Sequence, residues 1–197
     1  MVTTLTAELT PRTDTTPAVA DVPAREKSGA RWVKRFPGSN SLDDLEPSFR
    51  TNAERFISAI KDAGGGVRIA ATYRPRERAY LMHNSSKISR GEIKADQVPA
   101  MPGVNIDWVH DTDEESKTAA SAMANAYSIV YPPALISRHT ERAAIDMTIT
   151  GIVGKKVKNA LDEAVEITKL SDLNAVGATY GVRKLASDPP HWSDNGR

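Results

Sequence analysis

His139 and Asp146 are two metal-binding residue types that lie seven positions apart in the stretch Ser137-Arg-His-Thr-Glu-Arg-Ala-Ala-Ile-Asp146. In one α-helix their side chains would sit about 10 Å apart along the axis, too far to share an ion bound at roughly 2 Å. On one straight strand an odd separation would send them to opposite faces of the sheet. A shared site therefore requires a turn between them. We place it at the polar run Thr140-Glu-Arg142, so that His139 ends one element and Asp146 lies on a following strand.

A third imidazole, His191, belongs to the run Asp188-Pro-Pro-His191-Trp192 near the end of the sequence. The two prolines fix their φ angles, and a polyproline turn of about three residues would project Asp188 and His191 to the same side. Two His and one Asp leave a fourth metal position for water, which is typical of catalytic zinc. Zinc lowers the pKa of such a water to about 7. Asp188 can then accept its proton, and Arg74, between a predicted strand and a predicted helix, can stabilise an oxyanion.

Together, these residues resemble the M15 zinc metallopeptidases through three motifs: Ser137-x-His139-x-x-x-x-Ala144-x-Asp146, Asp188-Pro-Pro-His191-Trp192 and Ala71-Thr-Tyr73-Arg74-Pro75. The family includes D-alanyl-D-alanine carboxypeptidases, the D,D-dipeptidases of vancomycin resistance and phage L-alanyl-D-glutamate endolysins, which share the Hedgehog/D,D-peptidase fold. The resemblance extends from about Phe49 to Asp194. It implies that His139, Asp146 and His191 bind Zn2+. It also implies that Asp188 is the general base and that Arg74 binds and polarises the substrate.

Two positions depart from the family pattern. Many members have Glu at the base position, whereas this chain has Asp188, as some phage-type members do, and the shorter side chain would alter rate or specificity. A glycine that is usual between the histidine and the aspartate is Arg142 here. This predicts either a turn of different shape or an Arg142 side chain that faces the substrate. Ser137 would hydrogen-bond a ligand or satisfy a strand edge.

The resemblance implies an enzyme that hydrolyses a bond in peptidoglycan stem peptides. The bond would be D-Ala-D-Ala for a carboxypeptidase or L-Ala-D-Glu for an endopeptidase, and the motifs do not choose between them. A non-catalytic zinc-containing cell-wall-binding module of a phage or secretion apparatus is the alternative, although Asp188 and Arg74 argue against a dead site. Two His and one carboxylate also form the facial triad of non-haem iron oxygenases. In those enzymes, however, the first His and the acid usually lie much closer in sequence.

Composition excludes several other functions. Apolar residues make up 40% of the 197-residue chain and charged residues 26%, and the net charge of +1 argues against nucleic-acid binding. Without cysteine there are no disulfides, thiol nucleophiles or Cys-type zinc sites. No run approaches the ~18 apolar residues of a membrane span, and the start of the sequence lacks the pattern of a secretory signal. We therefore expect a monomer that is made in the cytoplasm and acts on the cell wall in the periplasm, after release by a phage holin or delivery by a secretion machinery.

Apolar periodicity predicts an α+β fold with a mainly antiparallel sheet flanked by helices. Residues 1–28 are predicted to be a flexible N-terminal segment and 29–197 a single domain, with Trp32 and Phe36 in its core. Residues 84–113, which are polar and interrupted by Gly and Pro, are interpreted as an insertion over the site. Helices are expected over 46–63, 76–82, 113–129 and 171–180, and strands over 67–73, 134–138, 143–150 and 182–185. Residues 156–158 and 164–167 predict a hairpin, with a helix over 156–167 as the alternative.

Overall fold

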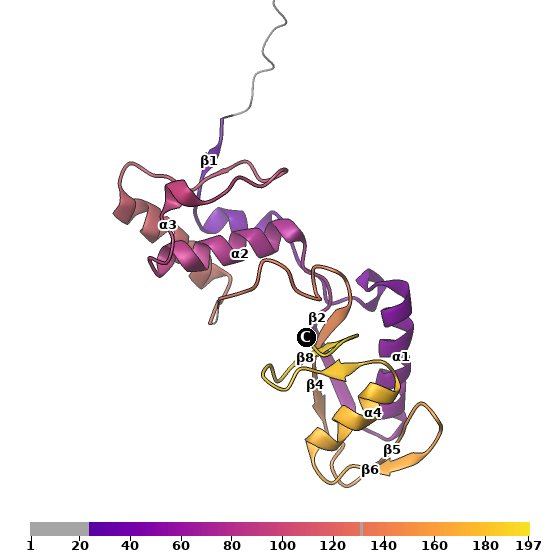
Figure 1. Ribbon diagram of the computed structural model, residues 1–197. Helices are drawn as coiled ribbons and strands as arrows, with labels where there is room; N and C mark the ends of the chain where they lie inside the picture. Colours follow the sequence, from indigo (N-terminus) through magenta and orange to yellow (C-terminus); the bar gives the residue numbers. More distant parts are fainter. Residues whose placement is uncertain (1–23, 131) are drawn as a thin grey trace, which may run out of the picture.

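The computed structural model describes residues 24–130 and 132–197, which form a sheet lobe and a helical lobe (Figure 1). The sheet lobe contains a four-stranded antiparallel sheet in the order β2-β4-β8-β7. Its strands are β2 (Gly66–Ala71), β4 (Ala144–Thr150), β7 (Arg183–Lys184) and β8 (His191–Ser193). The same lobe holds α1 (Pro47–Asp62), α4 (Leu173–Thr179), the 3-10 turns η2 (Leu42–Asp44) and η4 (Leu170–Asp172), and an antiparallel hairpin of β5 (Lys156–Lys158) and β6 (Ala164–Glu166). The predicted α+β class and the predicted hairpin are confirmed.

Helix α1 has clear sequence signals at both ends. The Glu46 carboxylate accepts hydrogen bonds from the backbone N–H groups of Ser48 and Phe49, and Pro47 occupies the first helical position. At the other end Gly64 takes a left-handed φ of 81°, which lets the chain leave the helix. The helix was therefore predictable almost to the residue.

Strand β4 separates the core of the sheet lobe from its site-bearing face. Ile145 and Met147 are buried in the core, and Asp146 between them points to the opposite face. Trp192, paired with Ile145 across the ladder, packs its ring 5.3 Å from that of Phe56 on α1. One face of the sheet is thus closed by α1, and the other is available for chemistry.

The helical lobe has its own apolar core. It comprises α2 (Arg76–Ser89), α3 (Asp113–Ala126), the 3-10 turns η1 (Ala30–Lys34) and η3 (Ala95–Gln97), and two short parallel strands, β1 (Glu26–Lys27) and β3 (Ile106–Asp107). Its buried side chains are Trp32, Tyr80, Leu81, Ile88, Val104, Ile106, Trp108, Ala120 and Met123, with Phe36 partly buried against them. Residues 29–197, predicted as one domain, therefore contain two separate clusters of buried apolar side chains.

The prediction of a polar insertion at 84–113 is wrong. Helix α2 continues to Ser89, and Ser85 and Ser86 are buried within it. Asn84 and Ser85 satisfy their side chains on carbonyls of their own helix, at Tyr80 (2.9 Å) and Met82 (3.1 Å). The helix backbone can therefore satisfy buried polar side chains at two of these three positions, whereas the Ser86 hydroxyl has no hydrogen-bond partner within the described residues.

The strand predicted over 134–138 is also wrong. Both edges of β4 are already paired, with β2 on one side and β8 on the other, so this stretch has no edge of β4 to join. Leu135 and Ile136 are instead exposed. The last helix differs in its start, because α4 begins at Leu173 after the 3-10 turn η4 and is not capped by Ser171.

The N-terminal boundary lies earlier than the sequence indicates. Most of the segment predicted to be flexible, residues 1–23, falls outside the described residues. Glu26 and Lys27 form β1 beside β3, and Ser28 is buried. No helix in the described ranges has both the length and the apolar character needed to cross a membrane.

Candidate metal centre

Asp146 and His191 meet because they are direct cross-strand partners. Strands β4 and β8 are antiparallel, and their register pairs Asp146 with His191. Directly paired residues project to the same face with their Cβ atoms about 5 Å apart. The register of two short strands therefore brings together residues that are 45 positions apart in sequence.

His139 reaches the same point from a tight turn. The turn over residues 138–142 is closed by hydrogen bonds from Arg142 N–H to His139 O (3.3 Å) and from Ala143 N–H to Arg138 O (2.8 Å). The Arg74 N–H also donates to His139 O, at 3.2 Å, which ties this turn to the end of β2. The turn predicted at residues 140–142 and the placing of Asp146 on the following strand are confirmed.

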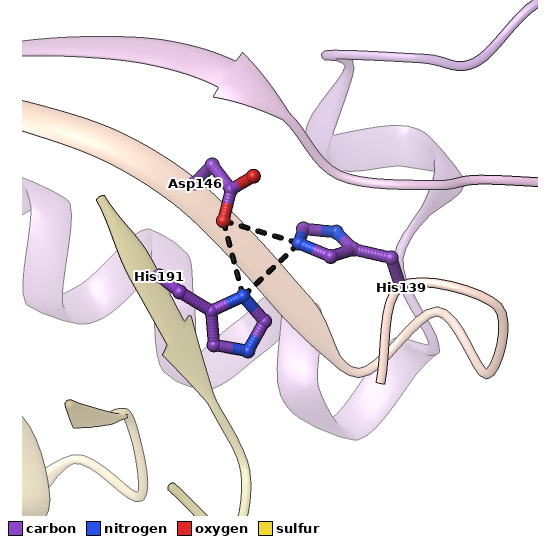
Figure 2. Close-up of side chains that lie close together, drawn as sticks. All are labelled: His139, Asp146 and His191. Atoms are coloured by element: carbon purple, nitrogen blue, oxygen red, sulfur yellow. Dashed lines mark hydrogen bonds and ion pairs between the residues drawn. The ribbon is translucent and has the colours of Figure 1, made fainter. Parts of the chain in front are cut away.

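Three ligand atoms form a near-equilateral triangle (Figure 2). His139 Nε2, His191 Nδ1 and Asp146 Oδ1 each lie 3.1 Å from the other two. Ligands bound at about 2.0–2.1 Å in a tetrahedral zinc site lie about 3.3 Å apart. The three side chains thus already have the spacing that one metal ion requires, and they form a group that could hold one.

Backbone carbonyls fix which nitrogen of each imidazole faces the centre. His139 donates its Nδ1–H to Thr72 O (3.0 Å), and His191 donates its Nε2–H to Arg197 O (3.1 Å). The opposite nitrogens, His139 Nε2 and His191 Nδ1, therefore carry lone pairs directed at Asp146. This is the usual outer hydrogen bonding of histidines that bind a metal.

The three inner atoms are all acceptors when the imidazoles are neutral. Both histidines are buried, at 3% and 5% exposed, so water reaches the group poorly. Burial by itself would raise the pKa of Asp146, but a proton on the inner nitrogen of His139 or His191 supplies a hydrogen bond and a positive charge, which outweigh burial and hold the pKa well below its usual value. Asp146 is thus ionised. Its negative charge and the two imidazole lone pairs would be stabilised by a cation bound between the three inner atoms.

The metal group lies in a cleft of about 840 Å³ whose lining includes all five residues predicted to form the site: Arg74, His139, Asp146, Asp188 and His191. Much of the remaining lining is apolar, and this apolar wall consists of Met82, Ile129, Val130, Pro132, Pro133, Ala134 and Ile136. Asp188 is exposed on a turn closed by a 3.1 Å hydrogen bond from His191 N–H to Asp188 O, not on an extended polyproline segment. The turn still carries both residues to the cleft.

Arg74 lies between β2 and α2, as predicted. Burial lowers the pKa of its guanidinium, and Asp146 and Asp188 oppose that effect. Among the described residues, no ion pair or hydrogen bond holds its side chain, whereas Arg138 in the same cleft is held by Glu141 and Asp194. The charge of Arg74 is therefore available to a ligand, unlike that of Arg138.

The Arg142 side chain does not face the cleft, although facing the substrate was one of the two expectations about this residue. Its φ of 61° is in the left-handed region that favours glycine, so the turn keeps the conformation that the family's usual residue would suit. Its guanidinium lies 4.1 Å from the centroid of the Tyr73 ring and donates to Asp44 O, away from the cleft lining. Ser137 Oγ bonds no ligand; within the described residues this buried hydroxyl has no hydrogen-bond partner.

The remaining histidines and the segment 84–113 lie outside the site. His83 Nδ1 bonds Pro133 O at 2.8 Å, and His110 bonds the Ser28 hydroxyl. None of residues 84–113 lines the cleft. No residue pattern pointed to the outer carbonyls of Thr72 and Arg197, because every residue has a backbone oxygen. The contribution of residues 129–130 and 132–136 to the apolar wall could have been suspected from their apolar and Pro content.

Comparisons with protein-family models, with curated proteins and with solved structures found no match to this chain.

Proposed function

We propose that this protein is a zinc-dependent peptidase of the M15 type, with the Hedgehog/D,D-peptidase fold, which hydrolyses a peptide bond in peptidoglycan stem peptides. One observation carries the proposal: two lone pairs and one carboxylate converge at 3.1 Å, with both outer imidazole N–H groups already bonded to carbonyls. A bound cation satisfies all three inner atoms together. Two His and one carboxylate are the ligand set of catalytic zinc in several hydrolases.

His139, Asp146 and His191 would hold Zn2+, which when bound supplies Lewis acidity and an acidic water at neutral pH. Asp188 lies in the same cleft and is exposed, so it can take a proton from water and return it to the leaving amine. Arg74 presents an uncommitted guanidinium to the same cleft and would bind the scissile carbonyl as negative charge develops on it. The apolar wall would contact the substrate in the same cleft.

The proposal is tested with purified muropeptides. The protein, stripped of metal and then reloaded with one equivalent of zinc, is incubated with them, and products are identified by mass spectrometry. We expect cleavage that is lost on chelation and restored by zinc. Release of D-Ala identifies a carboxypeptidase, and separation of L-Ala from D-Glu identifies an endopeptidase. Cleavage that survives chelation would contradict the proposal, and binding to sacculi without product would favour the non-catalytic module.

Two variants, each with a control, separate the role of a metal ligand from that of the base. His139→Ala should lose zinc affinity by more than the roughly 10–100-fold typical of an outer-shell change. Asp188→Asn should still bind zinc but lower kcat by about 10²- to 10⁴-fold. His110→Ala, a histidine of the helical lobe, is the control for the first variant. Asp162→Asn, an exposed aspartate away from the cleft, is the control for the second.

Cell-wall peptides lie outside the cytoplasm, so the proposed enzyme needs a route to them. Release through a phage holin or delivery by a secretion machinery would supply it. Neither route requires this chain to insert into a membrane.

A further inference from the structure

The loop that joins β7 to β8 carries both Asp188 and His191, and its backbone forms a closed ring of hydrogen bonds. Leu185 N–H donates to His191 O (3.2 Å), His191 N–H donates to Asp188 O (3.1 Å), and Asp188 N–H donates to Leu185 O (3.2 Å). These three residues thus bond one another in a cycle. The ring sets the path of the loop that presents the proposed base and the third metal ligand.

One ammonium group bonds the same three carbonyls. Lys184 Nζ donates to Leu185 O (2.5 Å), to His191 O (3.0 Å) and to Asp188 O. An ammonium has three N–H donors and each carbonyl has two lone pairs, so the donors of Lys184 and the acceptors of the ring match one to one. Lys184 is half-buried, and its ammonium lies 5.7 Å from the centroid of the Trp192 ring.

Three carbonyls that converge on one point repel one another unless a positive charge lies between them. The loop has no regular secondary structure from Leu185 to Pro190, and besides the ring a backbone hydrogen bond from Met147 N–H to Pro190 O (2.9 Å) ties its end to β4. Without the ammonium the loop would be expected to open, which would move Asp188 and rotate the backbone that places His191. Lys184 would therefore affect the geometry of the metal centre without contacting the substrate.

We propose that Lys184 is a positioning residue of the metal centre, which fixes the 185–190 loop so that His191 is aligned as a ligand and Asp188 as the base. This inference rests on the proposed function, because it assumes that zinc binds at His139, Asp146 and His191. The direction of the change in zinc affinity when Lys184 is replaced distinguishes positioning from a simple charge effect. Removing a cation near a metal site should tighten zinc binding by Coulomb's law alone, whereas loss of positioning should weaken it.

The experiment compares Lys184→Met, which keeps the length of the side chain and removes its donors, with Lys184→Arg and with the control Lys156→Met on the exposed hairpin. Zinc affinity is measured at constant pH by competition with a chromophoric chelator. The urea midpoint of each metal-free variant reports folding. Muropeptide cleavage gives kcat and KM.

We expect Lys184→Met to fold, to bind zinc about 10- to 100-fold more weakly and to lower kcat more than it raises KM. Lys184→Arg, which keeps charge but presents a planar fork, should fall between it and the wild type. Zinc affinity and kcat within twofold of the wild type, or tighter zinc binding, in a folded Lys184→Met variant would overturn the proposal. If Lys184→Met does not fold, Lys184→Arg decides: weaker zinc binding supports the inference, and unchanged binding overturns it. A wild-type protein that binds no zinc refutes the proposed function instead.

Discussion

At the residue scale, the chemistry of the site depends on where the protons of two imidazoles lie. Carbonyls of Thr72 and Arg197 accept the outer N–H groups, so the inner nitrogens face Asp146 without a hydrogen between them. In the absence of metal, the group can be satisfied only by protonating an imidazole. The same arrangement binds a divalent cation without rearranging either ring, because the ligand atoms are already spaced for it.

Asp146 should make the metal-free protein sensitive to acid. Its folded pKa lies below the value of about 3.9 in an unfolded chain, so the unfolded state takes up the proton first as pH falls. The stability it contributes is complete above about pH 4 and is lost as pH falls towards the folded pKa. We expect urea midpoints of the metal-free wild type to fall more steeply below about pH 4 than those of Asp146→Asn. Asp162→Asn is the exposed control, and parallel curves for wild type and Asp146→Asn would contradict the assignment.

Arg142 offers a test of the turn that presents His139. Arg142→Gly removes the cost of about 1–2 kcal/mol for a left-handed residue with a Cβ but loses the guanidinium contacts to Tyr73 and Asp44. We expect its unfolding free energy to stay within about 1 kcal/mol of the wild type. Arg142→Val keeps a Cβ, adds branching and loses the contacts, and should cost about 1–3 kcal/mol and weaken zinc binding. Equal stability of the two variants in urea denaturation would show that the turn tolerates any residue.

At the element scale, the alternation of β4 and its register with β8 produce the site. Ile145 and Met147 bury one face against α1, and this fixes Asp146 on the other face. A slip of one residue would reverse both faces, so burial of the core also enforces the position of the ligand. Core packing and the geometry of the candidate metal group are therefore set by the same strand.

Close approach of α4 supports β8 from the core side. A Cβ at Gly177 would lie 2.7 Å from Val182 O and 2.8 Å from the Trp192 ring, and Trp192 follows the ligand His191 directly. Alanine normally stabilises a helix interior relative to glycine by about 0.5–1 kcal/mol. Gly177→Ala should instead destabilise by about 1–3 kcal/mol through overpacking. Ala175→Gly, exposed on the same helix, controls for propensity, and an increase in thermal midpoint for Gly177→Ala would refute this packing argument.

At the scale of the whole molecule, the cleft lies between a lobe that supplies the metal ligands and a stretch that returns from the helical lobe. Residues 129–130 and 132–136 follow α3 and supply most of the apolar lining of the cleft, with Val130 and Ile136 more than 70% exposed. His83 on α2 bonds Pro133 O and so ties this segment to the helical lobe. The helical lobe thereby shapes the substrate side of the cleft, although it contributes no metal ligand.

Truncation at two nearby points tests where the folded part begins. Removal of residues 1–28 deletes β1, including the hydrogen bonds from Glu26 N–H to Asn105 O and from Ser28 N–H to Asp107 O, and the Lys27 carbonyl that accepts from the Trp32 indole. At about 1 kcal/mol per hydrogen bond, we expect a chain starting at residue 29 to be roughly 2–3 kcal/mol less stable in urea than one starting at residue 24. Zinc affinity of the two should agree, because the ligands belong to the other lobe. Equal stabilities would place the boundary at residue 28.

Local sequence signals were enough to locate most helices and strands and to identify the residue types of the site. Apolar residues at helical spacing and the glycines after residue 63 were sufficient to place α1, and the apolar content of 143–150 was sufficient to place β4, because those signals act within a few residues. Neither one helix nor one straight strand can bring His139 and Asp146 to the same ion, so the sequence also predicts a turn between them. Local signals failed at 84–113 and 134–138, where polarity suggested an insertion and apolar residues suggested a strand.

The arrangement of these elements and site residues in space depends on tertiary contacts. Whether polar residues are buried in α2 depends on the helix surface that covers them, and whether 134–138 pairs depends on which strand edges remain free. The position of His191 opposite Asp146 is a matter of register between strands far apart in sequence. Backbone carbonyls accept the outer imidazole N–H groups and the hydrogen bonds of Lys184. Every residue has such a carbonyl, so no residue pattern can reveal these contacts. The sequence therefore identified the candidate ligand residues, and tertiary contacts fixed the orientation of their side chains.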